Sequence, residues 1–516
     1  MTVTRRRDFI AGLTGAASLS LGLRHLNPIT AAQAAEPVRG GNLSAAIVLE
    51  TASLDPIFGN AGGADRSYYN LYTENLLYQD AAGVFHPVLA ESWELAPDRL
   101  SLMFKLRPGV KFQDGTPFDA AAVKFNLDRV VDPAVGARSR QFITELDSVE
   151  VIDPLKVKIK LKRPSGPFLT VLATEPGSML SPTAVRQRGA EFARSPVGTG
   201  PFNIVRWGGG RLEARRFDGY WGRPAYLDTV TLRVISNTAV KLVELKSGNV
   251  QLGDIVQVKD MAEIEADPKL RLVDTIQHIT SYISFNNAAE PFKSNLDLRK
   301  AISYAVNREA IEKAISRGQG GVLNSVEVPT SRAWSNEIKG HPYDPKLARE
   351  AYQRSGHKGP LTILVIQRDP DTQVAQIVQS MCKAAGIDLR IEVLERLAWV
   401  ERVLNARYEL GLLRASSPAS DPDITFSSFY GRSAASDFSH IKNPEIWDMI
   451  DRARGLSDMN ERRQIYVAIQ QKIVDNYWQT YLFWRPQKEV ARKELQGFSR
   501  EYSGAWRYND MWLAPG

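Results

Sequence analysis

The histidines and the single cysteine of this 516-residue chain lack the spacing that catalytic or metal chemistry needs, and its many carboxylates cannot be paired from the sequence. No two histidines lie four residues apart, which excludes a helical His-x-x-x-His zinc motif. Neither a Gly-x-Ser-x-Gly nucleophile turn nor a Gly-x-x-x-x-Gly-Lys phosphate loop occurs. The single cysteine, Cys382, excludes an internal disulfide. We therefore expect no enzyme activity, no cofactor and no metal, with an unrecognised hydrolase as the alternative.

A polar loop at residues 414–423 is the first candidate for a binding segment. It follows the last of three predicted strands, at residues 361–366, 387–393 and 408–413, which alternate with two predicted helices. This order predicts right-handed crossovers and a parallel, doubly wound sheet. Ligands bind beyond the carboxyl ends of the strands in such sheets, and the loop begins there.

Length and composition describe a globular protein with more than one core. A chain of 516 residues with 43% hydrophobic and 24% charged residues predicts two large lobes or about three domains. The net charge of +7 is mild, and no run of Lys and Arg with interleaved aromatic residues occurs. Nucleic acid is therefore not an expected partner.

The first 35 residues have the pattern of an export signal. Arg5, Arg6 and Arg7 precede Phe9, Ile10 and a weakly apolar stretch, and small residues stand at 32–34. This pattern resembles a twin-arginine signal, with a general secretory signal or a basic tail as alternatives. No cysteine lies near the cleavage site, so we expect a soluble periplasmic protein that is not a lipoprotein.

Other local patterns predict individual elements. We expect a helix over residues 65–77, a hairpin over 91–106 that turns near Pro97, and a helix begun by Asp297 as its cap. Apolar residues at helical spacing predict a helical stretch at 142–146 and a long helix after Asn460, and residues 481–484 are typical of a strand.

Four segments, in this order, resemble the family-5 solute-binding proteins of ABC importers, which include peptide, nickel, opine and glutathione receptors. They are Leu-Arg-Pro-Gly-Val-Lys-Phe-Gln-Asp-Gly-Thr-Pro-Phe at 106–118, Val-Gly-Thr-Gly-Pro-Phe at 197–202, Tyr-Ile-Ser-Phe-Asn at 282–286 and Leu-Arg-Lys-Ala-Ile-Ser-Tyr-Ala-Val-Asn-Arg at 298–308. The resemblance covers nearly everything after residue 40. The glycines and turn pairs in these motifs suit structural roles, so the motifs identify a fold and not a ligand.

The resemblance implies an α/β, two-lobe periplasmic-binding-protein fold with doubly wound mixed sheets and two hinge crossings. Lobe I would contain residues 36–278 and 487–516, with an extra subdomain at about 80–195. Lobe II would contain residues 279–486. The expected function is to capture a small peptide-like, opine-like or other carboxylate- and amine-bearing solute between the lobes. The protein, a monomer, would then deliver this solute to an ABC permease in the inner membrane. A carrier of a nickel chelate or metallophore is the alternative.

The resemblance also places ligand contacts on the loop before Asp421. Peptide receptors of the family usually carry an aromatic residue and an amine-binding acid there, whereas this chain has Ser416, Ser417 and Ser420, which predicts a roomier pocket with hydroxyl groups. Asp421 is expected either to bind an amine or to cap a helix that starts at Pro422.

Further site candidates come from charge and aromatic character. Arg414 suits bidentate pairing with a carboxylate, or it is a solvated charge at a strand end. The resemblance implies a carboxylate-binding arginine near Arg140, with surface exposure as the alternative. Trp399 and Tyr430 are candidate walls of the pocket, with core packing as the alternative, as are Tyr68, Trp334 and Trp484.

Overall fold

The computed structural model describes residues 36–59, 63–417, 421–434 and 436–515. The predicted export signal and Ser420 therefore lie outside the described residues. Residues 37–516 form one compact unit. No helix among the described residues combines the length and the apolar character needed to cross a membrane.

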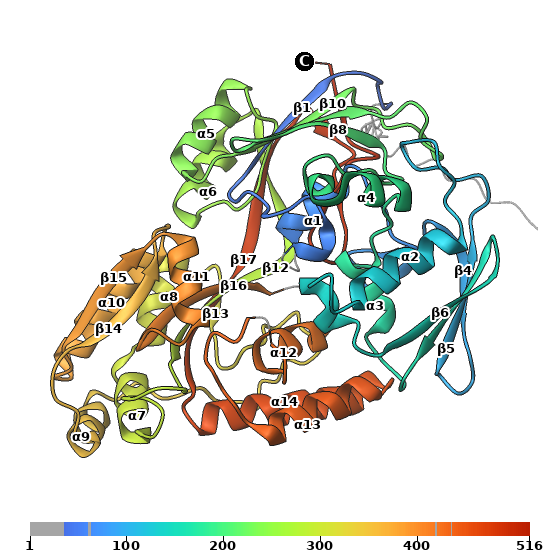
Figure 1. Ribbon diagram of the computed structural model, residues 1–516. Coiled ribbons are helices and arrows are strands. Elements are labelled where there is room, and N and C mark those ends of the chain that lie inside the picture. The colour runs from blue at the N-terminus through green and yellow to red at the C-terminus, as the bar shows by residue number, and fades with distance from the viewer. Residues whose placement is uncertain (1–35, 60–62, 418–420, 435, 516) are drawn as a thin grey trace, which may run out of the picture. The chain divides into compact units, whose positions relative to one another are not determined.

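A mixed sheet of 11 strands runs through this unit in the order β15-β14-β16-β12-β17-β11-β1-β10-β9-β8, with β13 paired to β17 (Figure 1). Its strands are β1 (Asn42–Ile47), β8 (Phe202–Gly208), β9 (Arg211–Arg216), β10 (Thr229–Val234), β11 (Leu252–Gly253), β12 (Leu270–Phe285), β13 (Gly321–Val322), β14 (Leu361–Ile366), β15 (Leu389–Leu394), β16 (Leu410–Ser417) and β17 (Gln479–Arg492).

The long strands β12 and β17 join two halves of this sheet. They pair antiparallel from Leu270 opposite Arg492 to Ser284 opposite Gln479, with an irregularity between Asp274 and His278. One end of the pair continues through β11 into β1, β10, β9 and β8, and the other continues through β16 into β14 and β15. The expected crossings, after residues 278 and 486, fall on this pair, while the lobe boundaries themselves stay predictions.

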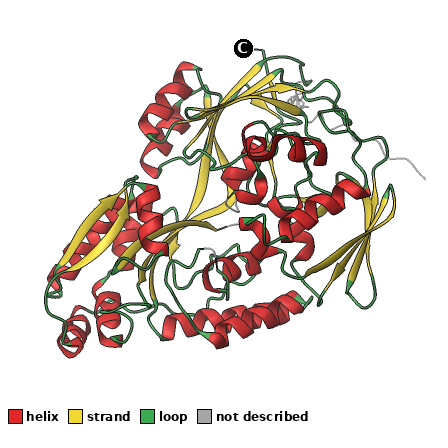
Figure 2. Ribbon diagram, in the orientation of Figure 1, coloured by secondary structure: helices red, strands yellow, loops and turns green. Residues whose placement is uncertain are grey.

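The strand–helix order expected for residues 361–413 is confirmed. β14 pairs parallel with both β15 and β16. Ile363 and Val365 belong to one hydrophobic core, whereas Leu364 and Ile366 belong to another on the opposite face. Figures 1 and 2 show helices accompanying these strands. The helices of this part of the chain are α7 (Leu296–Ala305), α8 (Arg308–Ser316), α9 (Pro345–Ser355), α10 (Asp371–Ala384) and α11 (Arg396–Leu404).

Three further helices pack on the second of these cores. The predicted long helix is confirmed as the last of them, and it buries Ile465, Ile469 and Ile473. They are α12 (Pro422–Tyr430), α13 (Pro444–Gly455) and α14 (Met459–Asp475).

The residues before 270 add a second, antiparallel sheet with the order β4-β5-β7-β6, which includes the predicted hairpin. Its strands are β4 (Ala90–Leu95), β5 (Ser101–Leu106), β6 (Leu146–Asp153) and β7 (Lys156–Leu161). The α-helices of this part of the chain are α1 (Gly63–Tyr69), α2 (Ala120–Val131), α3 (Phe168–Leu172), α4 (Pro182–Arg188), α5 (Thr238–Ser247) and α6 (Val258–Ala266).

Short elements complete the fold. The remaining strands form two-stranded pairs: β2 (Leu77–Gln79) with β3 (Phe85–Pro87), β18 (Leu495–Gln496) with β21 (Trp512–Leu513), and β19 (Ser499–Arg500) with β20 (Trp506–Arg507). The 3-10 helices are η1 (Pro56–Phe58), η2 (Arg138–Phe142), η3 (Glu175–Gly177) and η4 (Gly189–Arg194).

Three local predictions were wrong. The helix expected over 65–77 ends at Tyr69, and residue 77 begins a strand. The cap of α7 is Asn295, whose side chain accepts the Leu298 N–H, so Asp297 lies inside the first turn. The helical stretch expected at 142–146 is instead the end of η2 followed by the start of β6.

The early end of α1 has a tertiary cause. The carbonyl of Tyr72 accepts the Gly200 N–H at 2.9 Å, and the carbonyl of Leu71 accepts the Phe202 N–H at 2.8 Å. These bonds take backbone groups that a longer helix would use internally. A Cβ on Gly200 would lie 2.6 Å from the Tyr72 carbonyl carbon, so glycine allows this close approach.

The substitution Gly200→Ala should therefore lower the free energy of unfolding by about 1–3 kcal/mol, because the added methyl group meets backbone that cannot move aside. Urea denaturation measures the effect. Gly455→Ala is the matched control, since the nearest atom to its added Cβ is 3.9 Å away. Equal stability of the two variants would show that the close approach is not a packing constraint.

Candidate ligand-binding site

Three arginines stand at the carboxyl ends of the parallel strands. Arg368 follows β14, Arg396 follows β15, and Arg414 lies in the second half of β16, three residues before its end. This edge of an α/β sheet is where ligands bind, since the strands end and the chain leaves room for polar groups. Sequence reasoning selected only Arg414. The other two could have been found, because Arg368 comes two residues after the predicted strand at 361–366 and Arg396 three residues after the one at 387–393.

Arg414 and Arg368 share the carboxylate of Asp371. The Nε of Arg368 donates to it at 2.6 Å, and a guanidinium nitrogen of Arg414 lies 3.5 Å away. Arg414 also donates to the Asp369 carbonyl at 2.7 Å. Burial lowers the pKa of Arg414 to about 9, and the positive charge of Arg368 adds to this effect. Contacts within the protein thus fix the Arg414 side chain, while its pairing with a ligand stays a prediction.

Arg396 connects this cluster with residues from the first part of the chain. Burial lowers the pKa of Arg396, the negative charge of Asp65 in α1 opposes this, and the charges of Arg368 and Arg138 lower it further. Asp65 and Arg138 both precede the crossing at β12. Charges from segments before and after the β12 crossing therefore act on one arginine.

Arg138 is a second arginine in the region where the resemblance implies a carboxylate-binding residue. Both side chains are exposed, and both lie in η2. The charge of Arg138 reaches Arg396, whereas the structure shows no such link for Arg140 among the described residues. The role expected for Arg140 stays a prediction.

The serines of the candidate loop are only partly placed. The backbone of Ser416 pairs with Ile279 and that of Ser417 with His278, so β16 extends further than the expected strand. Their predicted ligand contacts stay untested.

Asp421 is the N-cap of α12, as one of the two expectations had it. Its side chain accepts the Asp423 N–H at 2.9 Å and forms an ion pair with Arg462 of α14, one contact of which is 2.6 Å long. Both carboxylate oxygens therefore have partners within the protein. Arg462 lies 41 residues further along the chain, and no local pattern in the sequence points to this pairing.

Two of the five predicted aromatic walls, Trp399 and Tyr430, are buried in the same hydrophobic core. Trp399 is 3% exposed and packs against Phe438, with the two ring centroids 5.7 Å apart. Tyr430 is 1% exposed, and its hydroxyl donates to Gln479 at 2.8 Å. Their positions match the core-packing alternative, and contact with a ligand stays a prediction.

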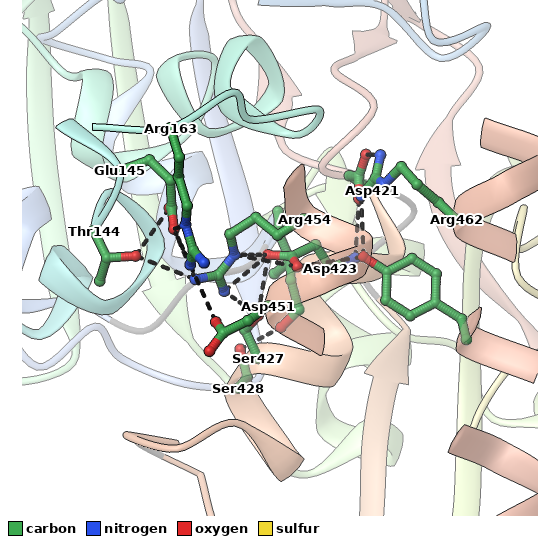
Figure 3. Close-up of polar contacts among 12 residues, drawn as sticks. Thr144, Glu145, Arg163, Asp421, Asp423, Ser427, Ser428, Asp451, Arg454 and Arg462 are labelled. Atoms are coloured by element: carbon green, nitrogen blue, oxygen red, sulfur yellow. Dashed lines mark hydrogen bonds and ion pairs between the residues drawn. The ribbon is translucent and has the colours of Figure 1, made fainter. Parts of the chain in front are cut away.

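A polar cluster joins residues 144–166 to α12 and α13, as Figure 3 shows. Arg454 donates to Asp423 at 3.1 Å and to Glu145 at 3.4 Å, and its carbonyl accepts the Gly166 N–H at 2.9 Å. Arg163 contacts Glu145 at 2.8 Å and Asp451 at 3.2 Å. Burial would lower the pKa of Arg454, but the carboxylates of Asp423 and Glu145 outweigh it and raise that pKa.

Known proteins resemble this chain over nearly its whole length. The model of the bacterial extracellular solute-binding proteins, family 5 Middle, matches residues 84–437. The glutathione-binding protein GsiB of Escherichia coli (strain K12) is 30% identical over 505 residues, which cover 94% of this chain and 96% of that protein.

The chain belongs to the family-5 extracellular solute-binding proteins.

Solved structures of relatives agree with the fold of this solute-binding protein. The periplasmic binding protein DppA from Helicobacter pylori, in complex with the peptide STSA, superposes with a TM-score of 0.84 at 25% identity, covering 93% of this chain and 99% of that one. AgaA from A. tumefaciens R10, in complex with agropinic acid, gives a TM-score of 0.82 at 24% identity, with coverages of 92% and 99%. The expected two-lobe α/β fold and the function in an ABC importer are confirmed, and the family and these relatives are binding proteins.

A buried acid near Asp421 escaped the sequence analysis. Glu327 is 2% exposed, and its Oε1 has no hydrogen-bond partner among the described residues. Burial, opposed by Ser331 and supported by the negative charge of Asp421, raises the pKa of Glu327 to about 7. Glu327 lies between two valines outside any helix or strand, so no periodic pattern marks it.

The substitution Glu327→Gln should flatten part of the pH dependence of stability. Because the folded state keeps a proton on Glu327 up to about pH 7 and the unfolded state releases it near pH 4.5, the wild type should lose about 3 kcal/mol of unfolding free energy over this window. The unfolding free energy of the variant should fall by about 3 kcal/mol less than that of the wild type over the same pH range. Guanidinium unfolding at pH 4.5 and 7.5 measures the difference, with the exposed Glu309→Gln as control. Parallel pH profiles for wild type and Glu327→Gln would refute the assignment.

Proposed function

We propose that this protein captures a small peptide-like, opine-like or other carboxylate- and amine-bearing solute between its two lobes and delivers it to an ABC permease of the inner membrane. The observation that carries the proposal is the set of arginines at the carboxyl ends of β14, β15 and β16. Guanidinium groups bind carboxylates through paired, charge-assisted hydrogen bonds, and these bonds are stronger where water is excluded.

The position of the arginines suits a two-lobe receptor. Arg396 is influenced by Asp65 and Arg138 from lobe I and by Arg368 from lobe II. A solute held at this point would touch both lobes, so its binding energy would favour the closed state over an open one. The lobe boundaries expected from the sequence, 36–278 with 487–516 and 279–486, form part of this proposal.

The relatives support the ligand class. GsiB is named for glutathione, a tripeptide with two carboxylates and one amine, DppA was solved with a peptide, and AgaA with agropinic acid. All three ligands carry a carboxylate. Glu327 is a candidate partner for the amine, because Asp421 is already paired with Arg462.

The setting of the proposed function comes from the N-terminal pattern. A twin-arginine signal over residues 1–35 would export the folded protein to the periplasm, where a monomeric receptor without enzyme activity would meet its solute. The family description as extracellular supports export.

Thermal-shift and calorimetric titration with glutathione, dipeptides, opines, sugars and nickel–histidine will test the proposal. We expect a carboxylate-bearing solute to raise the melting temperature at millimolar concentration. Selective binding of nickel–histidine would favour the chelate carrier, product formed during prolonged incubation would favour a hydrolase, and no shift with any solute would overturn the proposal.

In the same assay, Arg414→Gln should weaken binding of whichever solute the wild type binds by about 10–100-fold, which corresponds to the loss of one hydrogen bond to a charged group. Arg349→Gln, an exposed arginine on α9, is the control and should bind as the wild type does. Equal affinity of Arg414→Gln and wild type would place the ligand elsewhere.

A further inference from the structure

Arg485 is a buried cation whose charge the protein leaves largely unmatched. It lies in β17, and the residue is 2% exposed. One terminal nitrogen donates to the Val256 carbonyl at 3.4 Å, a long contact, and the other has no partner among the described residues. Burial lowers the pKa of Arg485 to about 10. Buried charged groups normally have an ionic or hydrogen-bonded partner, so this nitrogen points to a ligand.

The strand register places Arg485 on the same face of the sheet as the candidate site. Arg485 is opposite Ile279 of β12, and Ile279 is opposite Ser416 of β16. Directly opposite residues of paired strands present their side chains on one face, and residues two apart share that face. Arg414, two residues before Ser416, therefore lies on the face of Arg485, and the charge of Arg485 contributes to lowering the pKa of Arg414.

One buried carboxylate contacts two of the three arginines Arg368, Arg414 and Arg485. Asp371 is 2% exposed and contacts Arg368 and Arg414, and its negative charge opposes the lowering of the pKa of Arg485 by burial. The exposed Asp369 adds a weaker negative charge to Arg414. The balance is positive, and an uncompensated charge in this setting is costly unless an anion joins it.

We propose that Arg485, together with Arg414 and Arg368, forms an anion subsite and that the solute carries two carboxylates, one for this subsite and one near Arg396. This inference rests on the proposed function, because it concerns the same site, and it narrows the ligand to peptide-like diacids. Arg485 then sets the specificity for the carboxylate that enters the anion subsite, while the other carboxylate lies near Arg396.

Isothermal titration with matched pairs of probes tests the inference. Glutathione is compared with its monoethyl ester, and the dipeptide Ala-Glu with Ala-Gln, so that each pair differs by one carboxylate. In the wild type we expect the diacid of at least one pair to bind ten or more times more tightly. In Arg485→Gln the two members should differ by less than threefold. Lys488→Gln, which removes a partly exposed cation from the same strand, should keep the wild-type preference.

Equal affinity of both members of each pair, or a preference that survives in Arg485→Gln, would overturn the inference while leaving the proposed function intact. If no diacid binds but monocarboxylate solutes do, the inference fails alone. If nothing in the wider panel binds, the proposed function fails with it. Inorganic phosphate is titrated in parallel, and tighter binding of phosphate than of either diacid would also overturn the carboxylate assignment.

A second measurement separates a binding role from a structural one. Arg485→Met removes the unmatched charge and keeps much of the apolar volume, so the ligand-free melting temperature should stay level or rise while the diacid preference is lost. A purely structural arginine would show a lower melting temperature and an unchanged preference. Arg485→Lys keeps the charge without the planar fork and should retain an intermediate preference.

Discussion

The antiparallel pairing of β12 with β17 is the constraint on which the rest of the structure depends. These strands run from one half of the sheet into the other, and they pair from Leu270 opposite Arg492 at one end to Ser284 opposite Gln479 at the other, so both halves share one ladder. The irregularity after Asp274 interrupts the ladder where the halves meet. A bulge of this kind bends a strand without breaking the sheet, which suits a hinge. Arg485 lies in this crossing strand, so a ligand bound there would act directly on the hinge.

Much of the fold follows from local pattern, and the site follows only in part. The strands and helices between residues 361 and 417 obey simple patterns, because β14 is buried on both faces, α10 buries one face, and the edge strand β15 is only partly buried. That order alone places Arg368, Arg396 and Arg414 at one edge. It does not reveal Arg485 or Glu327, since each reaches the region through pairings that connect distant segments.

Errors in the prediction of single elements share a physical origin. α1 ends early because Gly200 and Phe202 take the carbonyls of Tyr72 and Leu71, a contact made across more than a hundred residues of chain. The choice of Asn295 over Asp297 as cap is different, since both side chains suit the role and only the exact start of the helix decides between them. The periodicity of the sequence predicts neither the long-range hydrogen bonds that end a helix early nor the exact residue at which a helix starts.

The cluster around Arg454 and the group of Arg368, Arg414 and Arg485 beside Asp371 differ in how fully the protein pairs their charges. This difference gives them different roles. Arg454 has Asp423, Glu145 and a backbone contact, so its charge is balanced by the protein itself. Contacts of this kind hold residues 144–166 against α13 in a defined position, yet their net contribution is small, because desolvation offsets much of the attraction. Arg485 instead retains an unpaired nitrogen in a positive environment. The first cluster can align the surfaces that meet when the lobes close, whereas the second gains free energy only when an anion is present. Closure would then depend on the solute, as a receptor that reports occupancy to a permease requires.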